Sequence, residues 1–503
     1  MKLGFEAAIF LCILCALLWI PSPSFAATRY VNVNSTNSVA PYTGWSTAAR
    51  TLQDAADISA DGDLVLVTNG YYQAGGVANF PFGSLLTNRL AITNAITVQS
   101  VNGPSVTFIV GSNTLDNAAI RGVFMASGSA LIGFTVSHCS TRKVGYNYDD
   151  RSGGGIWCSD SSCVISNCII ADNDAQDDAA GVLWGTLYNC TLLRNDCGES
   201  GGGVREGILY ACTLRDNFAF RGGGVYYSTL YNCTVASNIA FRGGGAEGGD
   251  FFHCTIVTNW AMQNAGGVFE GQMVNCIVYH NDGASNANWE GGTISYTCTD
   301  PLPVGDGNIT NEPGLVSVPA GNFRLMSNSP CVDAGTNGVA FVDKDGVPRP
   351  LDGNLDGINI ADMGAYELVH DAGDSDRDGM LDGWEIDYRL NPLDPADAAL
   401  DPDADGPVSH DEFIAGTDPN NSNSYFRLTR VRQSATNELV TWGSATGRVY
   451  VLERMTGMTG NTWSVTASGL AARPPENTYT DAVSEVQSYY RVWVNRTNAY
   501  YPP

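Results

Sequence analysis

Lysine and charge are both scarce in this sequence. Only 16% of the 503 residues are charged, and acidic residues outnumber basic ones by 52 to 26, so the formal net charge is −26. Beyond residue 26 the only lysines are Lys143 and Lys344. This balance argues against nucleic acid and against anionic membrane surfaces as partners, because their phosphates would be repelled. It suits the binding of divalent cations.

Long apolar runs are absent except at the N-terminus. There Lys2 precedes the apolar stretch "AAIFLCILCALLWI" and the small residues of "PSPSFAA", a pattern typical of a secretory signal peptide. The run is too short and wrongly flanked for a membrane-spanning helix, and no later stretch is long enough. We therefore predict a signal peptide over residues 1–26 and no transmembrane helix after its removal. The mature chain is expected to be a monomer that is secreted or held at the bacterial cell surface.

A helical period is lacking as well, because 57 glycines, several in clusters of two or three, would break helices. Instead, cysteine recurs at intervals of 21 or 22 residues, and asparagine follows each of the first six cysteines by five positions. The cysteines are Cys168, Cys190, Cys212, Cys233, Cys254, Cys276 and Cys298, and the asparagines are Asn173, Asn195, Asn217, Asn238, Asn259 and Asn281. Such a period, with short strands and glycine-rich corners, predicts a parallel β-helix with one repeat per turn.

Equivalent residues of successive turns would then stack about 4.8 Å apart. We expect the repeated cysteines to form a buried column of thiols, because parallel side chains do not converge to disulfide distance without strain. The asparagines are expected at corners, in left-handed backbone conformations and bonded to one another. The cysteines outside the column are better disulfide candidates, with the Cys158–Cys163 pair first, and their redox state is left open. They are Cys139, Cys158, Cys163 and Cys197.

Both ends of the repeat carry segments of distinct character. "WSTAARTLQDAADISADGDLVLV" predicts a short helix followed by a strand, which would cap the first turn. Residues 30–72 resemble the opening of bacterial secreted right-handed β-helix proteins of the pectin-lyase-like superfamily. "SPCVDAGTNG", "DKDGVPRPLDG" and "ADMGAYEL" resemble the closing segment of the choice-of-anchor Q group, which usually has alanine where Cys331 stands. The resemblance implies a fold and no single activity, since the superfamily holds lyases, hydrolases, epimerases and adhesins.

Two acidic motifs, "DSDRDGMLDGWE" at 374–385 and "DPDADGPVSHDE" at 401–412, have the spacing of calcium-binding loops. In the first, the expected Ca²⁺ ligands are Asp374, Asp376, Asp378, the carbonyl of Met380, Asp382 and Glu385. In the second, they are Asp401, Asp403, Asp405, the carbonyl of Pro407, Ser409 and Glu412. The pair resembles dockerin or thrombospondin type 3 repeats, because no long helix is expected before Asp374. The alternative is a solvated acidic linker.

A third acidic group misses the calcium spacing at its end and is interpreted as surface turns. It comprises Asp343, Asp345, Asp352, Asn354, Asp356 and Asp362.

Candidate catalytic residues are few. A pectate-lyase-like reaction needs a base and a cation, and the scarcity of lysine leaves arginines such as Arg221 and Arg242, which occupy equivalent positions in adjacent turns. A hydrolase needs two carboxylates about 5–10 Å apart. The weak candidates are Asp177, Asp178, Glu206, Glu247 and Glu270. Corner arginines that bind carbonyls are the structural alternative, and whether the protein is an enzyme is left open.

The sequence thus predicts an all-β chain. We expect a right-handed single-stranded parallel β-helix with an N-terminal capping helix over 27–327 and its closing segment over 328–370. Paired calcium loops follow over 371–422, and a fibronectin type III-like β-sandwich over 423–503. The predicted function is that of a secreted or cell-surface calcium-binding protein that contacts polysaccharide or cell-surface glycans, with sugars stacking on Trp184, Tyr226, Tyr227 and Phe269. The alternative is a polysaccharide lyase or glycoside hydrolase acting on the same face.

Overall fold

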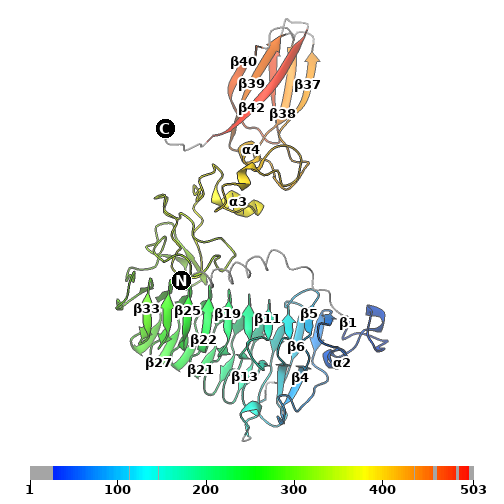
Figure 1. The fold of residues 1–503 in the computed structure, drawn as a ribbon, viewed down its shortest axis with the longest axis vertical. Coiled ribbons are helices and arrows are strands. Elements are labelled where there is room, and N and C mark those ends of the chain that lie inside the picture. The colour runs from blue at the N-terminus through cyan, green and yellow to red at the C-terminus, as the bar shows by residue number, and fades with distance from the viewer. Residues whose placement is uncertain are drawn as a thin grey trace, which may run out of the picture. The chain divides into compact units, whose positions relative to one another are not determined.

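The computed structural model describes residues 27–112, 114–144, 147–434, 437–456, 462–482 and 487–497. They form two compact units (Figure 1). The first unit extends to Arg349 and includes Ala361–Glu367; the second comprises Pro350–Ile360 and the chain from Leu368 onward. The predicted signal peptide lies outside the described residues. Among the helices of the described part, none has the length and apolar character needed to cross a membrane.

The first unit is a coil of short strands arranged in three sheets, which we call A, B and C. Sheet A has two columns of strands that merge in β22 (Val225–Tyr231) and β25 (Ala246–Phe252). One column holds β1 (Thr28–Val31), β2 (Leu64–Val67), β5 (Thr97–Ser100), β8 (Ala130–Ile132), β11 (Val164–Ser166), β15 (Thr186–Tyr188), β19 (Ile208–Tyr210), β29 (Gln272–Val274) and β33 (Thr293–Ser295). The other holds β4 (Thr87–Ile92), β7 (Ile120–Met125), β10 (Ile156–Cys158), β14 (Val182–Leu183), β18 (Val204–Arg205), β28 (Val268–Phe269) and β32 (Trp289–Glu290).

Sheet B supplies a further strand to each turn, and sheet C adds another strand in six of these turns. Sheet B consists of β3 (Gly70–Tyr72), β6 (Thr107–Val110), β9 (Thr135–Ser137), β12 (Ile169–Ala171), β16 (Thr191–Leu193), β20 (Thr213–Arg215), β23 (Thr234–Ala236), β26 (Thr255–Val257), β30 (Ile277–Tyr279) and β34 (Cys298–Thr299). Sheet C consists of β13 (Asp174–Ala175), β17 (Asp196–Cys197), β21 (Phe218–Arg221), β24 (Ile239–Arg242), β27 (Trp260–Asn264) and β31 (Asp282–Ser285). The paired strands of these sheets run parallel, for example β20 with β23 and β21 with β24. The predicted parallel β-helix is confirmed.

A short helix covers the first turn, as the sequence predicts. Helix α2 (Leu52–Asp57) follows the 3-10 turn η1 (Trp45–Thr47) and packs against β1, β2 and β4. The Thr51 hydroxyl accepts a hydrogen bond from the backbone N–H of Asp54 (3.1 Å), which caps the helix N-terminus. Its buried face is made of Leu52, Ala55 and Ala56. The helix therefore covers apolar residues that would otherwise lie open at the end of the coil.

The repeated cysteines line the interior, as expected. All seven are buried and carry free thiols, and each lies at the corner that precedes a strand of sheet B or begins β34. Cys331 of the closing segment hydrogen-bonds Cys298 and so extends the column. The cysteines outside the column are also buried and free, and the thiols of Cys158 and Cys163 are hydrogen-bonded to each other without a disulfide.

We expect these thiols to resist modification until the coil unfolds, because a reagent cannot reach a buried sulfur and burial disfavours the reactive thiolate. Burial raises the pKa of Cys139 to about 12, whereas the hydrogen bond with Cys158 lowers the pKa of Cys163 to about 6, so Cys163 is protected by its burial alone. The native protein should therefore react with few equivalents of a thiol reagent such as DTNB, whereas the guanidinium-unfolded protein should expose all twelve cysteines described. Fewer reactive thiols in the unfolded, unreduced protein would instead show that disulfides form.

The asparagine ladder differs from expectation in its backbone. Our prediction that these asparagines adopt left-handed conformations is wrong, because the left-handed residue is the one before each of them, such as Ser237 (φ 57°) before Asn238. The bend at that preceding residue lets the asparagine side chain point inward. Nδ2 of Asn238 then donates to Oδ1 of Asn259 at 2.9 Å, and Asn259 donates to Asn281 at the same distance.

The closing segment packs on sheet B and its adjoining corner. Nζ of Lys344 donates to the carbonyls of Ala211 (2.6 Å) and Cys212 (2.8 Å), and the backbone N–H of Ala365 donates to Oγ1 of Thr255. The guanidinium of Arg349 is buried, pairs with Glu367 at 3.3 Å and donates to backbone carbonyls of the segment. Before this segment, β35 (Leu315–Ser317) and β36 (Asn322–Leu325) form an antiparallel pair.

The second unit combines short helices with two antiparallel sheets. Helices α3 (Asp382–Tyr388) and α4 (Ser409–Ala415) begin within the last four residues of the two acidic motifs, and the 3-10 turn η3 (Asp397–Ala399) lies between the helices. One sheet contains β37 (Leu428–Ser434), β38 (Asn437–Gly443) and β41 (Glu476–Ala482); the other contains β39 (Arg448–Thr456), β40 (Ser464–Ala471) and β42 (Ser488–Arg496). Their shared core comprises Val440, Trp442, Tyr450 and Leu452. This confirms antiparallel sheets at the C-terminal end.

Candidate functional sites

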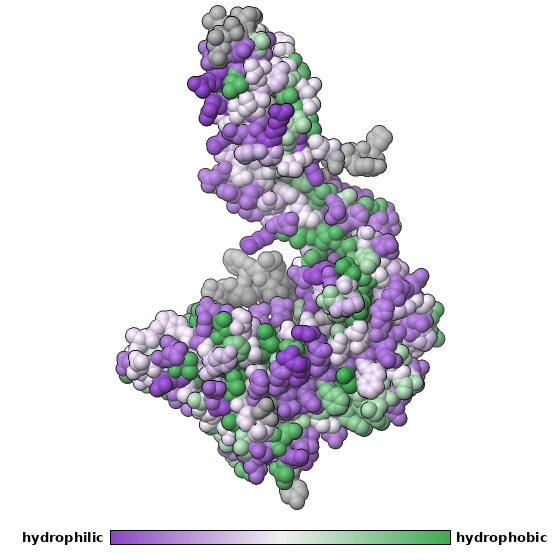
Figure 2. Space-filling model, turned by 180° about the vertical axis from the view of Figure 1, so that it is seen from behind, coloured by the Kyte–Doolittle hydropathy of each residue, from purple (hydrophilic) through white to green (hydrophobic). Residues whose placement is uncertain are grey.

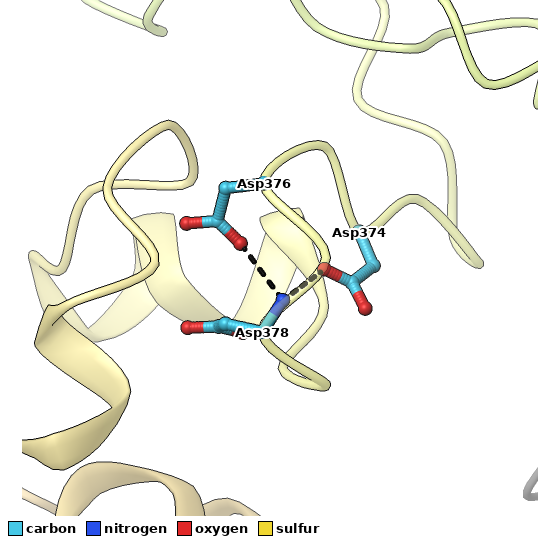
Figure 3. Close-up of side chains that lie close together, drawn as sticks. All are labelled: Asp374, Asp376 and Asp378. Atoms are coloured by element: carbon cyan, nitrogen blue, oxygen red, sulfur yellow. Dashed lines mark hydrogen bonds between the residues drawn. The ribbon is translucent and has the colours of Figure 1, made fainter.

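The first acidic loop gathers three carboxylates around one point. Oxygens of Asp374, Asp376 and Asp378 lie within 4.8 Å of one another (Figure 3). The loop is held in this shape by its own backbone: the N–H of Asp378 donates to Oδ1 of Asp374 and to Oδ1 of Asp376, both at 3.2 Å. Gly379, with φ 97°, turns the chain so that its N–H reaches Oδ2 of Asp374 at 3.1 Å.

A second group of carboxylates adjoins the first through Asp378. One oxygen each of Asp378, Glu385 and Asp397 lie within 4.8 Å of one another. Glu385 is fully buried, and neither of its oxygens has a hydrogen-bond partner among the described residues. Burial and the nearby carboxylates of Asp376 and Asp378 raise the pKa of Glu385 to about 9. A buried carboxylate without a partner is costly, and oxygen ligands of this kind fit Ca²⁺.

The structure places some predicted ligands elsewhere. Asp382 accepts hydrogen bonds from the N–H and the hydroxyl of Ser375 (2.7 and 2.8 Å) and is not grouped with the other carboxylates. Ser409 occupies the same position of the second loop, and its hydroxyl donates to the carbonyl of Leu400 (3.1 Å). Met380 is buried in the first loop, and Pro407 is half-buried in the second. Asp397 was missed because it lies outside the twelve-residue motif, where no loop spacing could indicate it.

The second acidic loop repeats the geometry of the first. Asp401, Asp403 and Asp405 lie within 4.8 Å of one another, and the N–H of Asp405 donates to the first two at 3.2 Å. Glu412 is buried; its Oε1 accepts from the hydroxyl of Thr417 (3.0 Å), while its Oε2 has no partner among the described residues. Burial raises the pKa of Glu412 to about 7. The residues of this loop therefore also fit a calcium ion.

Part of the third acidic group forms a similar turn. The N–H of Asp356 donates to Oδ1 of Asp352 (3.1 Å) and to Oδ1 of Asn354 (2.8 Å). The carbonyl of Gly357 accepts from the guanidinium of Arg377 (2.6 Å). The described part of this turn shows no buried carboxylate oxygen without a partner, so hydrogen bonds and an arginine account for its shape. The prediction that the whole group forms surface turns is wrong, because Asp343, Asp352 and Asp362 are buried.

An exposed apolar face lies on sheet C of the β-helix. Alanines at the centre of its strands point inward, and the residues on either side of them point outward. Phe218 and Phe220 are each 46% exposed, Trp260 is 40% exposed, and the rings of Phe220 and Phe241 stack 4.8 Å apart. We call Phe218, Phe220, Ile239, Phe241, Trp260 and Met262 the sheet C platform.

A groove of about 410 Å³ borders the sheet C platform. Polar and charged side chains line it beside the two stacked phenylalanines, namely Glu199, Arg221, Arg242 and Gln263. A second shallow groove of about 580 Å³ crosses sheet B, where Tyr71 stacks on Phe108 at 4.5 Å. On the face shown in Figure 2, apolar and polar residues are interspersed over the surface of the first unit.

The candidate catalytic carboxylates are mostly bonded to arginines. Asp177 pairs with Arg151 through two hydrogen bonds of 2.6 and 2.7 Å, and Asp178 pairs with Arg205 at 2.6 Å. Glu206 accepts from Arg205 (3.0 Å). These carboxylates therefore serve as counter-ions to arginine, an arrangement that holds the side chains in place rather than leaving a base free.

Three of the remaining candidates, Arg221, Arg242 and Glu247, meet where sheets C and A adjoin. Buried Glu247 pairs with Arg242 at 2.6 Å and lies 3.8 Å from Arg221. Glu270 is exposed and shows no ion pair among the described residues. The structure thus brings Arg221, Arg242 and Glu247 together, and one carboxylate between two arginines is not the pair of carboxylates that hydrolysis requires.

The predicted sugar-stacking residues are largely covered. Tyr226 is buried beneath the guanidinium groups of Arg205 and Arg221, and Phe269 beneath that of Arg242. Trp184 packs edge-on against Trp157, with ring centroids 5.2 Å apart. Of the four, Tyr227 alone is more than half exposed. The sheet C platform was missed, although alternating apolar residues between asparagine and glycine cluster, as in "NFAFRGGG", were a usable signal.

Comparison with known proteins identifies no family. No family model matches the sequence, and no curated protein matches it. Among solved structures, the pectate lyase Pel9A is similar over 69% of this chain and 98% of its own, with 13% identity and a TM-score of 0.42. A rhamnogalacturonan lyase is similar over 58% of this chain and 91% of its own, with 12% identity and a TM-score of 0.33. Likenesses this distant say nothing about activity.

Proposed function

We propose that this is a secreted or cell-surface protein that binds polysaccharide or cell-surface glycan chains on the sheet C platform and binds calcium in the loops at 374–385 and 401–412. The observation that carries the glycan proposal is the exposure of Phe218, Phe220 and Trp260 on sheet C. Exposed apolar patches with a polar rim commonly mark binding surfaces. Aromatic rings offer flat apolar area to the C–H faces of sugar rings.

The rim of the platform supplies the polar part of such a site. Arg221 and Arg242 lie at equivalent positions of β21 and β24, and Glu199 and Gln263 line the same groove. Guanidinium, amide and carboxylate groups can donate to or accept from sugar hydroxyls. Because each turn of the coil presents an equivalent row of side chains about 4.8 Å further on, the surface suits a chain-like ligand with a repeating unit.

Replacing both stacked rings, as Phe220→Ala with Phe241→Ala, is expected to weaken glycan binding roughly tenfold, since each lost aromatic contact contributes about 0.5–1.5 kcal/mol. A panel of acidic and neutral polysaccharides would first identify a ligand, and calorimetry would then compare the affinities of the variants. Both rings are at the surface, so the unfolding temperature should change little.

The matched control is Tyr71→Ala, which removes an exposed stacked ring from sheet B. Loss of binding in this control but not in the double variant would place the ligand on sheet B and contradict the proposal. New reducing ends or unsaturated products during the incubation would favour the hydrolase or lyase alternative.

A further inference from the structure

The carboxylate of Asp397 reaches the first calcium loop from outside it. Asp397 lies in η3, twelve residues after Glu385, yet one of its oxygens is within 4.8 Å of ligand oxygens of both Asp378 and Glu385. Asp397 is buried, and its Oδ1 has no hydrogen-bond partner among the described residues. Glu385, which faces it in the same group, is fully buried with both oxygens unpartnered.

We propose that Asp397 is a direct ligand of the ion in the first loop, and that this ion holds the segment 389–400 against the loop. The inference rests on the calcium binding proposed above. Three carboxylates this close repel one another strongly in a partly buried setting. A divalent cation converts that repulsion into attraction, because each oxygen then becomes a ligand.

The local structure explains how Asp397 is aimed. Its Oδ2 accepts a hydrogen bond from the N–H of Asn391 (2.7 Å), and this leaves Oδ1 for the ion. The backbone between these residues is a run of turns, in which Asp394 N–H donates to the carbonyl of Asn391 and Asp397 N–H to that of Asp394. An ion bound to Oδ1 would therefore fix the whole turn to α3.

The two loops are unequal in this respect. The first has Asp397 and Glu385 beside its three aspartates. In the second, Glu412 is not grouped with the aspartates, and one of its oxygens accepts a hydrogen bond from the hydroxyl of Thr417. Calcium affinity rises with the number of charged ligands and with the rigidity of the site. The first loop is therefore expected to fill at a lower calcium concentration than the second.

The test compares Asp397→Asn with Asp394→Asn in the full-length protein. Asp394 is exposed, lies on the same segment and belongs to neither carboxylate group, so its substitution removes an equal charge without removing a ligand. Isothermal titration with Ca²⁺, also in a Glu412→Gln background that isolates the first loop, should show the tighter step weakened roughly tenfold or more by Asp397→Asn. Asp394→Asn should leave it within about twofold.

Trypsin provides a readout of the segment itself. The exposed Arg389 follows α3 and begins this segment. Cleavage there, located by mass spectrometry, should be suppressed by calcium in the wild type and in Asp394→Asn but not in Asp397→Asn at the same calcium concentration. Equal affinity and equal protection in both variants would overturn the inference while leaving calcium binding intact. A wild type that binds no calcium would overturn the calcium proposal itself.

Discussion

Removing calcium with EGTA is expected to lower the unfolding temperature of the second unit by roughly 10–20 °C. An ion at one hundred times its dissociation constant stabilises a folded site by about 2.7 kcal/mol, so two such sites contribute about 5 kcal/mol. In a unit of this size each kcal/mol moves the midpoint by about 2–4 °C. Differential scanning calorimetry with and without chelator measures the shift. The transition of the β-helix should stay where it is, because the carboxylate clusters lie in the second unit.

The physical reason is visible in the loops. Buried oxygens of Glu385 and Glu412 have no partner among the described residues, so the chelated protein keeps uncompensated carboxylates close together. A variant with Glu385→Gln and Glu412→Gln should lose its response to EGTA. Equal midpoints for the wild type with and without chelator would show that the acidic motifs are solvated linkers.

Replacing Asn238 with alanine should destabilise the β-helix by about 3–5 kcal/mol, which is large for a single substitution. The Asn238 side chain donates to Asn259 and to the carbonyl of Leu214, and its Oδ1 accepts from both the backbone and side-chain nitrogens of Asn217. All of these groups are buried, so each would lose a partner that water cannot replace. Guanidinium unfolding followed by circular dichroism gives the change.

Ser237→Ala is the matched control for that substitution. Ser237 occupies the neighbouring position, and its hydroxyl makes an exposed contact of 3.1 Å with that of Thr258. The change should cost less than about 1 kcal/mol, because water can replace an exposed hydrogen bond. If both variants unfold at the same denaturant concentration, the amide ladder contributes little to stability.

The β-helix could be predicted because its evidence is repeated in the sequence. Cysteine, asparagine and glycine recur every 21 or 22 residues. Each repeat therefore indicates an inward side chain or a tight corner at the same position. Each acidic loop could also be predicted from the sequence, because the spacing of its expected ligands is contained within twelve residues. In both cases the contacts that fix the structure lie within one short segment or join equivalent residues of successive repeats.

The candidate binding face could be identified only from the three-dimensional structure. Phe220 and Tyr226 are close in the sequence and similar in chemistry, yet one is exposed and the other lies beneath two arginines. Which ring is covered depends on how neighbouring turns place their long side chains. The pairing of Asp177 with Arg151 and of Asp178 with Arg205 likewise joins residues that are distant in the sequence.

By itself, then, the sequence determined the coil of parallel strands, its buried thiol column and the two acidic loops. Only the tertiary structure decided that the left-handed residue precedes the asparagine, that sheet C carries the exposed rings and that Asp397 faces Glu385. The reason is physical: stacking at a fixed period follows from strand spacing, whereas contacts between segments with no common period depend on where each corner and turn directs the chain.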